Sequence, residues 1–243
     1  MIQEVIAMRS REFAYSSGQR VLSTDAAAFM QRVYGWMSAG LAVTGLSAFY
    51  IASSPAAIQF IFGSYLSIFL VIGVQLGLVF AIRPVMKRRG SFVGAMMFLA
   101  YSATLGVTVS TLLIRFTGPS VAQAFFVTAG AFGGLTIFAF ATKRDLSGLG
   151  NFCAVGIIGI ILASVVNIFM GSPALHFAIS VIGVLIFAGL TAYDTQKMRE
   201  YALSQDTDNE TGRRASIMAA LELYLDFIMM FIYLAQILGI SRD

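Results

Sequence analysis

Seven apolar segments, each about 20 residues long, alternate with short polar segments along most of the chain. An apolar stretch of this length crosses the hydrocarbon core of a bilayer as a helix. The predicted spans are 29–53, 60–82, 92–114, 121–142, 152–170, 174–193 and 217–240, and the sixth continues past Asp194. We therefore expect an all-α fold, a polytopic membrane bundle of seven transmembrane helices over residues 28–243, preceded by a cytoplasmic N-terminal tail at 1–27.

The seventh segment is apolar on every side except at its acidic residues, Glu222 and Asp226. A helix that lacks a polar face is usually enclosed by other helices. We expect the last helix to be central, with the first six spans forming three antiparallel hairpins around it. Gln75 in the second span and Asn167 in the fifth are expected to form hydrogen bonds to a neighbouring helix, the alternative for each being a pore-lining role.

Composition agrees with a membrane protein, since 58% of the residues are hydrophobic and only 12% are charged. A soluble domain carries about twice that charged fraction. No stripe of Lys and Arg interleaved with aromatic residues is present, so we expect no nucleic-acid partner despite a pI near 9.4. The bilayer itself is the expected partner.

Basic residues define the expected orientation. With the N-terminus in the cytoplasm and the C-terminus in the periplasm, every Lys and Arg except Arg115 and Arg242 belongs to a cytoplasmic segment. Cytoplasmic loops of membrane proteins carry an excess of Lys and Arg.

Asp194 and Asp226 lie within the last two apolar segments, in the sequences LTAYDTQK and LELYLDFIMMF. A carboxylate inside a bilayer costs several kcal/mol, so such residues commonly mark an ion path, a proton site or a ligand counter-ion. The polar segment 206–214 lies midway between them, about 12 residues or ~18 Å of helix from each. An antiparallel hairpin would bring both carboxylates to the same depth.

Two carboxylates at one depth in a low dielectric cannot both ionise cheaply, so the pair is expected to share a proton near neutral pH. Such a pair binds a proton or a hard cation such as Ca²⁺. Asp194 and Asp226 are thus the candidate pH-sensing, ion-binding and metal-ligating residues. The alternative is that each packs between helices through hydrogen bonds, without an ion.

Three further charged residues are candidates for the same site. Glu222 lies four residues before Asp226 on the same helix face, and either extends the acidic track or pairs with an Arg at the interface. Arg88, and after it Arg83, ends the second span on the cytoplasmic side and is a possible gating latch. The alternative for each Arg is a cytoplasmic lipid anchor.

The elements TKRDLSGLGN, LTAYDTQKM and LELYLDFIMMFIYLAQILG, on seven spans, closely resemble the bacterial branch of the Bax inhibitor-1 (transmembrane Bax-inhibitor-motif) family over residues 28–240. The resemblance implies a bacterial inner-membrane protein that acts as a pH-sensitive Ca²⁺ leak channel. It also implies that Asp194 and Asp226 are the paired acids of the pH-sensing site. No enzymatic activity and no tightly bound cofactor are expected, with Ca²⁺ as the transported ion and protons as the regulator.

Other functions remain open at this point. A proton-coupled cation exchanger would use the same acids, and a regulatory partner of membrane proteins would need no ion flux. An intramembrane aspartyl protease is disfavoured because LYLDF lacks the Gly-x-Gly-Asp motif of that class.

Overall fold

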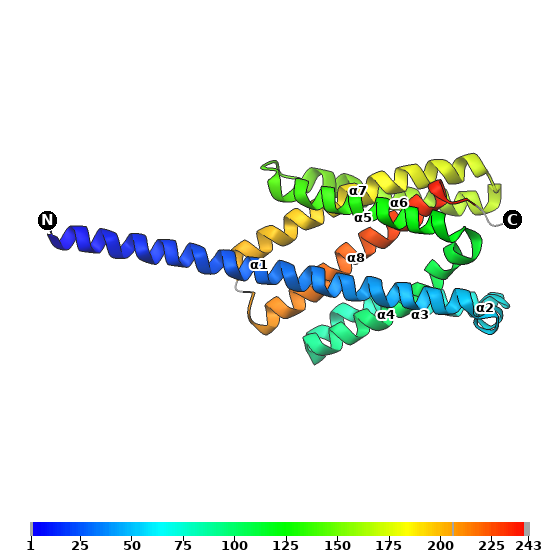
Figure 1. The fold of residues 1–243 in the computed structure, drawn as a ribbon, viewed down its shortest axis with the longest axis horizontal. Helices are drawn as coiled ribbons and strands as arrows, with labels where there is room; N and C mark the ends of the chain where they lie inside the picture. The colour runs from blue at the N-terminus through cyan, green and yellow to red at the C-terminus, as the bar shows by residue number, and fades with distance from the viewer. Residues whose placement is uncertain (1, 206, 241–243) are drawn as a thin grey trace.

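The computed structural model describes the backbone of residues 2–205 and 207–240, and the side chains of residues 26–205 and 207–240. The described residues form eight α-helices and no strand (Figure 1). The helices are α1 (Ile2–Ser53), α2 (Pro55–Phe62), α3 (Tyr65–Arg89), α4 (Ser91–Arg115), α5 (Gly118–Ala141), α6 (Ser147–Met170), α7 (Pro173–Ser204) and α8 (Glu210–Leu238). Seven of them are long and apolar enough to cross a membrane. In α1, the segment that meets this condition is Ala26–Ser53. The predicted all-α fold with seven spans is confirmed.

The short helix α2 is the one element that the apolar pattern did not predict. It occupies the first connection, where the Ser54 hydroxyl accepts a hydrogen bond from the Ala57 amide and Pro55 takes the first helical position. Ser before Pro is a common helix start, because the hydroxyl caps a free amide and proline needs no amide partner.

Helix α8 lies at the centre of the bundle, as predicted. It packs against α1, α4, α5 and α7, and it runs between the outer helices in Figure 1. Leu223, Tyr224 and Met230 on this helix have no exposed surface. An enclosed helix must be apolar on all sides, so the composition of α8 follows from its position.

The lateral order of the helices differs from the predicted hairpins. Helix α1 packs mainly against α4, not against its neighbour in sequence, α3, and α4 makes little contact with α5. Helices α1 and α4 approach each other closely at Gly106. A Cβ atom added there would lie 2.8 Å from the Thr44 carbonyl oxygen. Small residues permit such close approach between membrane helices.

Helices α3 and α6 lie on the outside of the bundle, where α3 packs on α4 and α6 packs on α7. Large apolar side chains such as Phe69 on α3 and Phe169 on α6 are exposed, as expected of surfaces that face lipid. The Gln75 amide donates hydrogen bonds to the Thr104 carbonyl (2.8 Å) and to the Thr108 hydroxyl (3.0 Å) on α4. The predicted interhelical role of Gln75 is confirmed. The Asn167 side chain instead accepts a hydrogen bond from the Ser172 amide just beyond the end of its own helix, α6 (3.1 Å).

A buried hydroxyl pair connects the central helix to α1. Thr44 Oγ1 and Tyr224 Oη are 2.6 Å apart, and Thr44 also donates to the Ser102 carbonyl of α4. The Phe98 and Tyr101 rings pack edge-on against Tyr224. Polar groups inside a membrane bundle need protein partners, because lipid supplies none.

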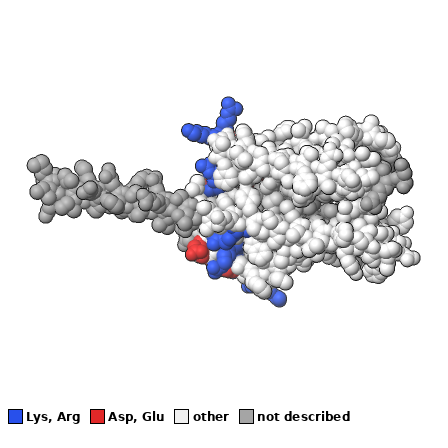
Figure 2. All heavy atoms as spheres, viewed as in Figure 1, with Lys and Arg blue, Asp and Glu red and all other residues white. Residues whose placement is uncertain are grey.

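The charged side chains gather at one end of the bundle. Figure 2 shows Lys and Arg at the end where α1 enters, with an almost uncharged surface beyond them. The α7–α8 connection lies at this end, where Arg32 donates to the Thr207 carbonyl (2.7 Å) and lies 3.6 Å from the Asp208 carboxylate. We call this the basic end.

Substitution of Gly106 tests the α1–α4 crossing. Gly106→Ala is expected to destabilise the protein by about 1–3 kcal/mol, because the new methyl group overpacks the contact with Thr44 and Ser47. Gly134→Ala is the matched control, since a Cβ atom there has nothing within 4 Å. Thermal unfolding of the purified variants in detergent measures both. Equal unfolding temperatures for the two variants would contradict the close crossing.

Candidate functional site

The antiparallel pairing of α7 and α8 decides where their acidic residues lie. The Ser180 hydroxyl donates to the Gln236 side chain (2.9 Å) near the far end of the pair. The Phe187 ring stacks on that of Tyr233, with centroids 6.1 Å apart. Continued toward the basic end, this register places Asp194 opposite the helical turn that carries Glu222 and Asp226.

Lys197 joins the two helices at that turn. Its ammonium nitrogen lies 3.1 Å from the Glu222 carboxylate on α8 and 3.7 Å from the Asp194 carboxylate on α7. The side chains are unequally exposed, at 51% for Lys197, 38% for Glu222 and 13% for Asp194. One half-exposed cation therefore neutralises part of the charge of two carboxylates.

Asp226 is the most deeply placed acid of the group, with only 5% of its surface exposed. Its Oδ2 atom is buried and has no hydrogen-bond partner among the described residues. Asp226 interacts electrostatically with Asp194, Glu222 and Lys197. An unpartnered buried carboxylate oxygen is costly, and such groups in native structures usually have a functional explanation.

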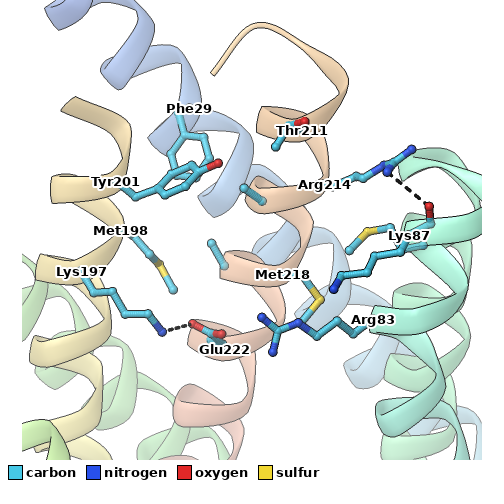
Figure 3. Close-up of a pocket in the computed structure, with 13 residues that line it drawn as sticks. Phe29, Arg83, Lys87, Lys197, Met198, Tyr201, Thr211, Arg214, Met218 and Glu222 are labelled. Carbon is cyan, nitrogen blue, oxygen red and sulfur yellow. Dashed lines mark hydrogen bonds and ion pairs between the residues drawn. The ribbon is translucent and has the colours of Figure 1, made fainter. Parts of the chain in front are cut away.

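Glu222 lines a cavity of about 460 Å³ at the basic end, which we call the inner cavity (Figure 3). Arg83 extends from α3 toward Glu222 across this cavity. Arg88 is exposed and is absent from the cavity lining. Of the two candidate latches, the fold thus brings Arg83 and not Arg88 toward the acidic residues. Arg83 forms no ion pair in the part of the chain that the structure describes.

Hydrogen bonds hold the helix ends that frame this site. The Glu210 carboxylate accepts from the Ser91 amide (2.7 Å) and hydroxyl (3.0 Å), which ties the start of α8 to the start of α4. The Gln196 side chain accepts from the Leu146 amide and donates to the Arg144 carbonyl, both at 2.9 Å, and ties α7 to the connection between α5 and α6. The acids are therefore presented by fixed helices.

The arrangement can bind and exchange positive charge. Three carboxylates from two helices become progressively more buried from Glu222 through Asp194 to Asp226. Carboxylate oxygens are ligands for hard cations and acceptors for protons. Lys197 contributes one positive charge to the group, so another cation or proton would compete with it.

Sequence reasoning did not assign Lys197 to the site. It was counted among the basic residues that set the orientation, although its position three residues after Asp194 places both on one helix face. A long Lys side chain can also reach toward water, so sequence alone does not distinguish these two orientations.

The chain is similar to known proteins over most of its length. The family model described as Inhibitor of apoptosis-promoting Bax1 matches residues 26–243. The chain is 43% identical over 215 residues to the inner membrane protein YbhL of Escherichia coli K12, covering 88% of this chain and 92% of that protein. An uncharacterised protein of Deinococcus radiodurans is also 43% identical, covering 88% and 91%. One of Borreliella burgdorferi is 38% identical, covering 88% and 93%.

Neutralising Asp226 is expected to stabilise the protein. Asp226→Asn keeps the shape of the side chain and removes the charge next to Asp194 and Glu222, so unfolding should require about 1–2 kcal/mol more. Asp145→Asn is the control, because Asp145 is exposed. The side-chain oxygen of Asn at this position can still accept the hydrogen bond that the Ser147 backbone amide donates. The control should change stability by less than about 0.5 kcal/mol. Thermal unfolding at mildly alkaline pH, where the acids are most ionised, measures both, and a loss of stability in Asp226→Asn would contradict the predicted repulsion.

Proposed function

Because the chain belongs to the Bax inhibitor-1 family, we propose that it forms a pH-sensitive Ca²⁺ leak channel across a bacterial inner membrane, gated by Asp194 and Asp226. The observation that carries the proposal is the buried and unpartnered Asp226 carboxylate beside Asp194 and Glu222. A group of this kind inside a membrane bundle is expected to hold or conduct cations.

The proposed orientation places the basic end in the cytoplasm, with the N-terminus inside and the C-terminus in the periplasm. The gathering of Lys and Arg at one end of the bundle supports it. The name of the Escherichia coli relative supports the inner membrane as the location.

In the proposed pathway, a cation from the cytoplasm replaces the Lys197 ammonium at Glu222, then meets Asp194, and then Asp226. Each step passes to a more buried carboxylate, where electrostatic attraction is less screened by water. Protonation of Asp194 and Asp226 removes the charge that attracts Ca²⁺, which makes the flux depend on pH. Arg83 is the residue we propose as the cytoplasmic latch, because it extends toward Glu222 (Figure 3).

Substituting the paired acids tests the proposal. Asp194→Asn and Asp226→Asn should each lower Ca²⁺ entry about tenfold, the factor that corresponds to ~1.4 kcal/mol of lost cation stabilisation. Each should also flatten the dependence of entry on pH. The measurement is Ca²⁺ influx into liposomes containing the full chain and a trapped indicator, with equal pH on both sides. Asp145→Asn should behave as the unsubstituted protein, since Asp145 is exposed outside the site.

The same assay separates the competing functions. Wild-type flux with an unchanged pH profile in both Asn variants would sink the proposal. Ca²⁺ movement that requires a pH difference across the membrane would indicate a proton-coupled exchanger. No flux together with stoichiometric co-purification of another membrane protein would favour a regulatory role.

Lys197 is proposed to act as a resident cation that competes with Ca²⁺. Lys197→Met should raise Ca²⁺ influx about two- to fivefold, the range that corresponds to a half-exposed ion pair worth up to ~1 kcal/mol. Arg199→Met is the matched control, because it removes one positive charge from the same helix turn without touching the acids. Equal effects of the two substitutions would show that only surface potential had changed.

A further inference from the structure

The inner cavity carries more positive charge than its acids can balance. Arg83, Lys87, Lys197 and Arg214 line it, and Glu222 is its single carboxylate. Glu222 is engaged by Lys197 (3.1 Å), and Arg214 is engaged by Glu210 outside the cavity (3.0 Å). Arg83 and Lys87 have no acidic partner among the described residues.

These two cations form a pair on one helix. They lie four residues apart on α3, so they share a face of that helix. In Figure 3 both side chains extend from α3 into the cavity. Arg214 donates to the Lys87 carbonyl (3.4 Å), which links the end of α3 to α8. The cavity thus presents two uncompensated positive groups on one wall.

Apart from Tyr201 and Thr211, the rest of the lining is apolar. Met86, Met198 and Met218 contribute to it. The flanking helices α3 and α7 do not pack against each other, and α8 lies behind the cavity between them (Figure 3). Lys87 lies two residues before the end of α3 at the basic end. Because α3 is long and apolar enough to span a membrane, its basic end is expected near the lipid headgroups.

We propose that the inner cavity binds an anionic phospholipid, with Arg83 and Lys87 holding the headgroup phosphate and the methionines contacting the upper acyl chains. Basic pockets between membrane helices on the cytoplasmic side suit anionic headgroups. Arg matches phosphate oxygens through two parallel hydrogen bonds, and Lys adds a point charge. The apolar walls favour a lipid over a free phosphate ion, because inorganic phosphate has no apolar part to bury.

The charge balance predicts which lipids bind. An anionic lipid such as phosphatidylglycerol offsets the positive groups without bringing a cation of its own. A phosphatidylcholine headgroup carries a quaternary ammonium, which the two cations repel. Selectivity for net negative headgroups is therefore part of the proposal, and it is independent of any ion flux.

Native mass spectrometry of the delipidated full chain with added phosphatidylglycerol tests the proposal. The double variant Arg83→Gln with Lys87→Gln should bind phosphatidylglycerol about tenfold more weakly. Arg88→Gln with Arg89→Gln is the matched control. It removes the same charge from the same helix end, outside the cavity lining, and should change binding less than about twofold. The charge-keeping variant Arg83→Lys with Lys87→Arg should retain binding, which separates lost charge from misfolding.

Three results of this experiment would overturn the proposal. Equal weakening in the cavity variant and the control would mean that phosphatidylglycerol senses only the general charge of the basic end. Equal binding of phosphatidylcholine would remove the selectivity for anionic headgroups. Displacement of phosphatidylglycerol by inorganic phosphate at matched concentration would assign the cavity to a free phosphate.

Discussion

The ammonium group of Lys197 lies between Glu222 and Asp194, and the charge balance of the acidic site depends on this contact. Three carboxylates from α7 and α8 interact with one another there, with Asp226 nearly buried. Carboxylates this close repel one another when ionised, and burial increases the cost. Lys197 offsets part of that repulsion, and the proposed protons or cations would offset the rest.

The surrounding helices explain why the acids remain in place despite this cost. Helix α8 is enclosed on all sides and joined to α1 through the Thr44–Tyr224 hydroxyl pair. Glu210 and Gln196 fix the helix ends near the site through hydrogen bonds to backbone amides. A well-packed frame can hold a locally unfavourable group, which is the common pattern of functional sites.

The helix count and the central position of α8 could be predicted, because the length of an apolar segment and the absence of a polar face are local properties of the sequence. The pairing of α1 with α4 could not, since it depends on a close contact at Gly106 that leaves no periodic signal. The placement of Asp194 opposite the turn that carries Asp226 follows from helical rise on the two arms of a hairpin. The choice between Arg83 and Arg88 depends on how α3 is rotated about its axis, which a cluster of basic residues around Pro84 does not reveal.

Infrared difference spectroscopy of the protein in lipid nanodiscs, between mildly alkaline and mildly acidic buffer, tests most directly whether α7 and α8 share protons among buried carboxylates. If they do, a protonated-carboxyl band grows as the pH falls, is lost in Asp226→Asn and is shifted in Asp194→Asn. A spectrum without such a band, or one that both substitutions leave unchanged, would contradict proton sharing.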